Sequence, residues 1–221
     1  MAQLTMVQAL NLALAEAMRE DPNVLVLGQD VAQDEGVFRV TEGLLQEFGP
    51  NRCIDTPLAE AGIVGSAIGL GFTGFRPVCE MQFEGFAFEA FHLIEGHLRR
   101  FRNRTRGRFT CPVVVRMPYG GGIRAIEHHS EAPEALYAHL PGLHVVMPSG
   151  PRTARALLRT AIFGSDPVIF FEPKAVYRAI REEVPETPET LPIGRGRVAR
   201  SGADVTMITY GAMLRPTLEA A

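Results

Sequence analysis

Short, almost wholly apolar runs recur along this chain and alternate with segments of helical periodicity. The clearest runs are Val24–Gly28, Val113–Met117 and Val168–Phe171. Strands of a parallel sheet have this character because helices cover both faces of the sheet and leave no side exposed to water. The alternation therefore predicts an α/β fold, in which a parallel sheet carries helices on both faces.

The remaining elements follow from local signals. Thr5 is placed to cap a helix whose apolar residues, from Met6 to Ala17, fall on one face. Thr41 is expected to cap a second helix that stops at Gly49-Pro50. Further strands are expected at Cys53–Thr56, Pro77–Gln82 and His144–Met147, and further helices from about Leu58, through Phe91 to Leu98, and at Glu134–Leu140 and Arg152–Phe163.

The domain organisation is expected to change near residue 180. Residues 1–180 hold the α/β pattern, and the stretch Arg181–Pro192 is rich in proline and acid, which is typical of a linker. We expect a domain at 1–180, a linker at 181–194 and the incomplete beginning of a second α/β domain at 195–221. Within the last part, Asp204–Tyr210 has the pattern of a buried strand.

Composition excludes several function classes. No run approaches the roughly 20 apolar residues of a membrane span, and no signal-peptide pattern is present, so a cytoplasmic protein is expected. A net charge of −3 argues against nucleic-acid binding. The arginine-rich run from Arg99 to Arg108 is expected to be a solvated helix end or a surface for an acidic partner. Three separated cysteines indicate reduced thiols.

Several known motifs can be rejected. The only lysine is Lys174, which follows a proline, so no Walker A loop exists. Gly69–Gly74 satisfies G-x-G-x-x-G, but it closes an expected helix and precedes a strand, whereas a dinucleotide site needs the opposite order. No G-x-S-x-G elbow is present. The adjacent His128 and His129 have no third ligand at a suitable spacing for a metal.

Two positions remain as candidates for chemistry. Glu60 lies where an expected strand gives way to a helix, and ligands of open α/β sheets bind at that end of the strands. Taken alone, an acid there is more often an ordinary residue of a first helical turn, favoured by the helix dipole. His128 and His129 lie in a long glycine-bearing loop after a strand, a location that suits acid–base groups as well as plain surface histidines.

Four segments, in order and at natural distances, make the sequence specific: DTPLAEAGIVGSAIG, RPVCEMQFEGF, HHSEAPEALYAHLPGLHVVMPS and PVIFFEPKAVYRAIREEVP. Together they resemble the beta subunit of the thiamine-diphosphate-dependent first component of 2-oxo acid dehydrogenase complexes. The resemblance covers essentially the whole chain and implies a fold like the pyrimidine-binding domain of transketolase. HHSEAPEA and FFEPKAVYR resemble the branched-chain enzymes most, although bacterial pyruvate dehydrogenases share much of the pattern.

The resemblance also implies roles for particular residues. Glu60 matches the glutamate that hydrogen-bonds N1′ of the cofactor aminopyrimidine, and His129 matches the active-site histidine that handles substrate and lipoyl group. The remaining cofactor contacts are matched by Leu58, Gln82 and Phe86, where many relatives have tyrosine in place of Phe86. The backbone carbonyls of Val113, Ala161, Gly164 and Asp166 match a potassium site of some relatives, which often carry Asp at the position of Gly164.

The implied enzyme is a complex. The family's magnesium-diphosphate ligands lie in a GDG…N segment of the alpha subunit, and this chain has no GDG. The resemblance thus implies an α2β2 tetramer that shares thiamine diphosphate between subunits and transfers an acyl group from a 2-oxo acid to the lipoyl group of an acyltransferase component. A branched-chain substrate is expected, with pyruvate or acetoin dehydrogenase as alternatives. A non-catalytic scaffolding subunit of the same fold is the alternative of another class.

Overall fold

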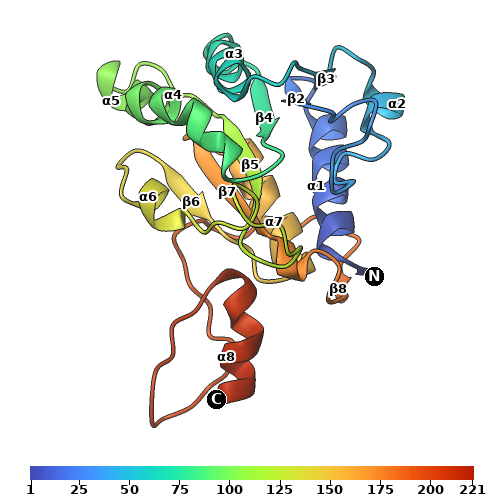
Figure 1. Cartoon of the computed structure of the whole chain (residues 1–221), viewed down its shortest axis with the longest axis vertical. Coiled ribbons are helices and arrows are strands. Elements are labelled where there is room, and N and C mark those ends of the chain that lie inside the picture. Colours follow the sequence, from blue (N-terminus) through green and yellow to red (C-terminus); the bar gives the residue numbers. More distant parts are fainter.

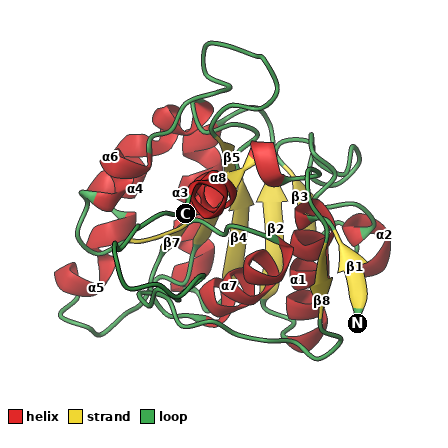
Figure 2. Ribbon diagram, turned by 90° about the horizontal axis from the view of Figure 1, so that it is seen from below, coloured by secondary structure: helices red, strands yellow, loops and turns green.

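The computed structural model describes all residues, 1–221, and has six parallel strands at its centre (Figures 1 and 2). Their order in the sheet is β3-β2-β4-β5-β7-β6. Their bounds are β2 (Val24–Gly28), β3 (Cys53–Asp55), β4 (Arg76–Glu80), β5 (Val114–Tyr119), β6 (His144–Val146) and β7 (Val168–Pro173). The expected parallel α/β sheet is confirmed.

Helices cover both faces of the sheet, and each strand contributes alternate side chains to the two cores (Figure 1). Val24 and Val26 of β2 join the core under α1 (Met6–Glu20) and α7 (Pro151–Phe163), whereas Leu25 and Leu27 join the core under α3 (Glu60–Phe72) and α4 (Phe91–Gly96). This alternation is the two-residue period of a strand. It explains why the strand sequences are mostly apolar at consecutive positions.

The remaining elements are short. The helices are α2 (Leu44–Phe48), α5 (Phe101–Arg104), α6 (Glu134–Ala138) and α8 (Leu214–Ala220). The 3-10 turns are η1 (Phe86–Ala90), η2 (Leu98–Arg100), η3 (Lys174–Val176) and η4 (Gly211–Met213). Two further strands, β1 (Ala2–Leu4) and β8 (Glu182–Val184), form a separate antiparallel pair.

The helix boundaries test the expected caps. Thr5 caps α1 through a capping box: Gln8 N donates to Thr5 Oγ1, and Thr5 N donates to Gln8 Oε1 at 3.0 Å. Such a cap is worth roughly 1 kcal/mol. The expected Thr41 cap is wrong, because the chain passes through a left-handed Gly43 (φ 78°) before α2 begins at Leu44. Gly49 does end that helix.

The C-terminal part differs from expectation at two places. The expected linker contains β8, which pairs with β1 (Ala2 opposite Val184), because the N-terminal residues offer it an extended partner. Asp204–Tyr210 is irregular and exposed, with Ile208 92% accessible, instead of a buried strand. A strand needs a neighbour for its N–H and C=O groups, and none of the eight strands lies beside this segment. Figure 1 shows it beyond the sheet, in red, next to α8.

Candidate active site

The carboxyl ends of four neighbouring strands bring the candidate residues to one edge of the sheet. β3, β2, β4 and β5 are adjacent in that order, and all run in parallel. Glu60 follows β3, Gln82 and Phe86 follow β4, and the loop that carries His129 follows β5. α3, which begins at Glu60, packs against η1, which begins at Phe86. This is the edge where open α/β sheets bind ligands.

Glu60 is buried without a partner. It occupies the first turn of α3, and only 7% of the residue is exposed. Its carboxylate makes no hydrogen bond or ion pair to any other side chain of the chain, although it lies at a helix start, where negative charge is favoured. The residue as a whole is buried, but its carboxylate oxygens are not among the fully buried side-chain atoms without a hydrogen-bond partner, so they still reach solvent. The carboxylate is thus available to a group from outside the chain.

Polar contacts fix the loops around Glu60. Gln82 Nε2 donates to Asp30 Oδ2 at 2.8 Å, which joins the end of β4 to the end of β2. The Asp55 carboxylate accepts hydrogen bonds from the backbone amides of Ala32 (2.7 Å) and Gln33 (3.1 Å), which joins the end of β3 to the same loop. Gln82 therefore lies at the site's edge with its amide nitrogen engaged and its amide oxygen unused by the chain.

His129 lies among aromatic rings. Its ring centroid is 4.4 Å from that of Phe83 and 5.1 Å from that of Phe86, both in edge-on arrangements, and the two phenylalanines contact each other at 5.7 Å. The structure thus brings together two of the expected residues, His129 and Phe86, from loops about 40 residues apart. Phe83 was not expected at the site, because it resembles any other apolar core residue in the sequence.

The imidazole of His129 has a defined orientation. Its Nδ1 lies 2.6 Å from the carbonyl oxygen of Glu127. A carbonyl can only accept, so Nδ1 carries the proton, and Nε2 of the neutral ring keeps a free lone pair. His128 is exposed, in the left-handed region (φ 63°), and its carbonyl accepts a hydrogen bond from Gly85 N at 3.2 Å. The two histidines therefore differ: one is oriented and packed against aromatic rings, and the other faces solvent.

Leu58, matched to a cofactor contact in the sequence, does not enclose Glu60. Its side chain is 73% exposed, while Phe86 is half-buried. The reason is that no element of this chain covers the segment between β3 and α3 on that side. An exposed leucine beside a buried, unpaired carboxylate fits a group with an apolar ring and a polar nitrogen, such as an aminopyrimidine.

A buried charge network lies beneath this edge and was not expected. Arg116 of β5 pairs with Glu80 of β4 (2.7 Å) and with Glu172 of β7 (2.7 Å), and Tyr177 Oη donates to Glu172 at 2.6 Å. Burial raises the pKa of the Glu80 carboxyl, and burial together with Glu172 raises the pKa of Tyr177. The signal in the sequence is a charged residue within each of three mostly apolar strands, at Glu80, Arg116 and Glu172.

The carbonyls matched to a potassium site are largely engaged. Gly164 O accepts Arg76 Nη1 at 2.8 Å, Ala161 O accepts Gly164 N at 3.3 Å, and Val113 O accepts Val168 N at 3.0 Å. The side chain of Asp166 accepts from Arg102 at 2.6 Å. A carbonyl oxygen has two lone pairs, so one hydrogen bond to each leaves a second acceptor position. The potassium site therefore stays a prediction.

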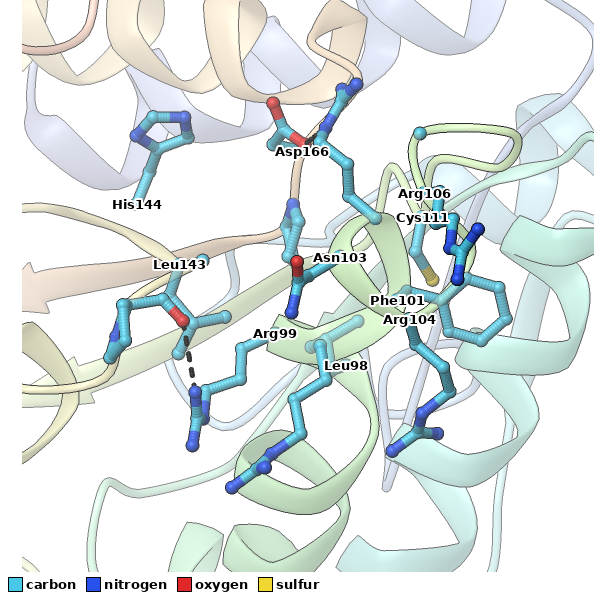
Figure 3. A pocket seen from close by; sticks show the side chains of 16 residues that line it. Leu98, Arg99, Phe101, Asn103, Arg104, Arg106, Cys111, Leu143, His144 and Asp166 are labelled. Carbon is cyan, nitrogen blue, oxygen red and sulfur yellow. Dashed lines mark hydrogen bonds and ion pairs between the residues drawn. The ribbon is translucent and has the colours of Figure 1, made fainter.

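A cavity of about 850 Å³ lies at the opposite edge of the sheet (Figure 3). Its lining comes from the arginine-rich run and from residues that precede β5, β6 and β7, among them Arg99, Arg106, Cys111, Leu143 and Asp166. Several arginines there have partners, such as Arg100 with Glu95 and Arg102 with Asp166. Because its lining residues lie before the strands, the cavity is separate from the candidate site at the carboxyl ends.

Comparison with known proteins decides the family. Residues 2–179 match the family described as transketolase, pyrimidine binding domain. The chain is 50% identical over 221 residues to the pyruvate dehydrogenase E1 component subunit beta of Bacillus subtilis, covering all of this chain and 68% of that protein. The chain belongs to the transketolase pyrimidine-binding family. Within it, the chain is similar to the E1 beta subunits of 2-oxo acid dehydrogenases.

Further relatives of this pyrimidine-binding domain agree. The same subunit of Staphylococcus aureus is 51% identical over 221 residues, and this chain covers 68% of it. That of Acholeplasma laidlawii is 48% identical over 215 residues, with 97% of this chain and 66% of the relative covered. The chain thus spans about two thirds of the length of these relatives. A solved structure described as a split-gene transketolase, inactive beta4 tetramer, has a TM-score of 0.78 and is 25% identical in sequence. The superposition includes all of this chain and 67% of the transketolase chain.

These names bear on the expected substrate. The relatives are named as pyruvate dehydrogenase, and the expectation of a branched-chain enzyme finds no support among them. The segments that suggested it, HHSEAPEA and FFEPKAVYR, form the histidine loop and the end of β7 with the turn that follows. They therefore belong to the candidate site and the elements that support it. No helix in the structure combines the length and the apolarity that a membrane crossing demands.

Proposed function

We infer that this chain is the beta-subunit part of a pyruvate dehydrogenase E1 component. In this proposal it binds the pyrimidine end of thiamine diphosphate, while an alpha subunit in an α2β2 tetramer holds magnesium and the diphosphate. The observation that carries the proposal is the buried, unpaired Glu60 at the same sheet edge as the oriented His129. The 48–51% identity to subunits of that name supports the pyruvate substrate over a branched-chain one.

Thiamine diphosphate supplies the electron sink that allows a 2-oxo acid to lose carbon dioxide. Glu60 would hold the ring nitrogen N1′ of the aminopyrimidine, because the residue is mostly buried while its carboxyl group has no partner in the chain. A carboxyl group that carries its proton can donate a hydrogen bond to that nitrogen. Leu58 and Phe86 would contact the ring faces, and Gln82 would line the edge with its unused amide oxygen.

His129 would serve the transfer of the acyl group to the lipoyl group of the acyltransferase component. Its Nδ1 proton is held by the Glu127 carbonyl, so Nε2 can accept or return a proton. Phe83 and Phe86 pack edge-on against the ring and restrict its plane. His128, exposed and turned by its left-handed backbone, has no such setting.

The proposal is tested with a complex of the full-length beta subunit, its alpha subunit and a lipoyl domain. We expect pyruvate to be turned over faster than branched-chain 2-oxo acids, and we expect neither substrate to release carbon dioxide when the beta chain is alone. His129→Ala should slow acyl transfer by about 10²–10⁴-fold, while His128→Ala should leave it near the wild-type rate. A preference for a branched-chain acid would reject the pyruvate substrate, and steady decarboxylation by the beta chain alone would reject the shared site.

A further inference from the structure

The only lysine of the chain is buried next to the histidine loop. Lys174 Nζ donates to both carboxylate oxygens of Glu84, at 2.9 and 3.1 Å, and both side chains are inaccessible to solvent. The chain has 22 lysines and arginines in total, and every other one is an arginine. The pair joins the end of β7 to the turn that precedes η1, across 90 residues of sequence.

A buried ion pair of this kind is weak evidence for stability. Desolvating two charges costs as much as or more than their attraction returns, so apolar residues of the same size are often tolerated in their place. Burial indeed lowers the pKa of Lys174 and raises the pKa of Glu84, although the hydrogen bonds between them act in the opposite direction. The presence of the pair therefore calls for another explanation, and its surroundings supply one.

Lys174 and Glu84 each lie next to residues that contact the loop 120–131. On one side, Lys174 Nζ lies 5.6 Å from the centroid of Phe83, whose ring packs on His129 at 4.4 Å. On the same side, Gly85, next to Glu84, donates to the His128 carbonyl. On the other side, a Cβ on Gly122 would lie only 3.1 Å from the amide nitrogen of Ala175, next to Lys174.

Gly85 is packed so closely against the loop that the turn and the loop cannot move independently. A Cβ on Gly85 would lie 2.5 Å from the His128 carbonyl oxygen, so the turn and the loop are in direct backbone contact. The base of the loop is closed by Gly120 N, which donates to Glu131 O at 2.7 Å. A shift of the Glu84 turn relative to β7 would thus move the Phe83 ring and the backbone of residue 128 together.

We propose that the buried Lys174–Glu84 pair is a positioning device for His129. It locks the β4–η1 turn to the end of β7, and the histidine loop is set between them. The inference rests on the proposed role of His129 in acyl transfer and goes beyond it, because neither Lys174 nor Glu84 touches substrate or cofactor. Its loss should slow acyl transfer by about tenfold or more, since displacements of about 1 Å in a catalytic group have effects of that size.

The test uses the reconstituted complex with the charge-neutral double variant Lys174→Met/Glu84→Gln, which keeps both volumes and leaves no buried charge without a partner. Two rates are measured: decarboxylation with a dye as electron acceptor, and acyl transfer to a lipoyl domain. We expect the dye-linked rate within about threefold of wild type, a kcat for acyl transfer reduced by about tenfold or more with unchanged KM for the lipoyl domain, and faster amide exchange of deuterium in residues 120–131. Lys174→Arg, which keeps the charge, should recover part of the rate.

A matched control pair lies away from the loop: Arg155 of α7 and Glu16 of α1 form an ion pair with both side chains mostly buried. Arg155→Met/Glu16→Gln should leave the ratio of the two rates unchanged. A wild-type ratio in Lys174→Met/Glu84→Gln overturns the positioning role. If His129→Ala slows transfer but the double variant does not, the positioning role alone fails. If His129→Ala has no effect, the proposed role of His129 fails, and the positioning role fails with it.

Discussion

The Arg116 guanidinium forms two parallel hydrogen bonds with the Glu172 carboxylate, from Nε to Oε1 at 2.7 Å and from Nη2 to Oε2 at 3.0 Å. Its third side, Nη1, donates to Glu80 at 2.7 Å. One cation of β5 therefore serves two buried carboxylates on β4 and β7, the strands on either side of β5. The fork geometry of arginine makes this possible, and a lysine could not replace it.

We predict that Arg116→Met lowers the free energy of unfolding by about 3–5 kcal/mol, because it leaves two carboxylates buried without a cation. Urea denaturation followed by circular dichroism measures the change. Arg215→Met, which removes an exposed ion pair with Glu219, is the control and should cost about 1 kcal/mol or less. Equal effects of the two substitutions would mean that the network contributes no more than a surface pair.

The unpaired Glu60 leads to a prediction about the cofactor. In the reconstituted complex, Glu60→Gln keeps the shape of the side chain and a hydrogen-bond donor but removes the acid. We expect thiamine diphosphate to bind still and its C2 proton to exchange with deuterium far more slowly, as measured by acid quench and NMR. Exchange at the wild-type rate would show that Glu60 is only an acid at a helix start.

The backbone contact at Gly85 can be tested by a single methyl group. Gly85→Ala places a Cβ 2.5 Å from the carbonyl oxygen of His128, so the loop must move away. We expect acyl transfer to fall by about 10²-fold, with a smaller effect on dye-linked decarboxylation. Gly96→Ala is the matched control, since a Cβ there meets no atom within 4 Å. Wild-type transfer by Gly85→Ala would imply that the loop tolerates displacement.

The cysteines predict how stability changes at alkaline pH. Burial raises the pKa of Cys53 to about 12 and that of Cys111 to about 11, against 9.0 for a free thiol. Between pH 9 and about 11 the unfolded chain releases these protons and the folded chain keeps them, so the stability that is present below pH 9 falls as pH rises. Urea midpoints at pH 8 and pH 10.5 measure this. Cys53→Ala/Cys111→Ala should lose less stability across the same interval.

The single lysine predicts a labelling pattern. The chain has two amines, at Met1 and at Lys174, and only the first is exposed. An amine-reactive reagent should therefore add one group to the native chain and two groups after unfolding, as counted by mass spectrometry. Rapid double labelling of the native chain would contradict the burial of Lys174.

The sequence predicts the sheet well, because a doubly covered strand leaves a local mark. Val24–Gly28 and Val168–Phe171 are apolar at every position, and both are strands. The same pattern fails at Asp204–Tyr210, since pairing depends on a neighbouring strand, which no local pattern specifies. The edge on which Glu60 and His129 lie also follows from the sequence, because each comes after an expected strand.

The support of the site could not be predicted in this way. Phe83 and His129 meet through loops that follow different strands, and Lys174 meets Glu84 across 90 residues. Each of these residues has an ordinary local role in the sequence: a core aromatic, a loop acid, a surface lysine. These residues come together only because β4 and β7 lie on either side of β5 in the folded sheet.

The antiparallel pair of β1 and β8 gives the molecule a mechanical property. Ala2 lies opposite Val184 and Leu4 opposite Glu182, so Met1 and Pro185 leave the pair at the same end. A force that pulls these two points apart opens the ladder one rung at a time, like a zipper, and never loads its bonds in shear. Arg155 of α7 also donates to the carbonyl oxygens of Pro185 and Glu186, so tension applied between residue 1 and residue 185 would separate the three residue pairs and also load this contact with the main core.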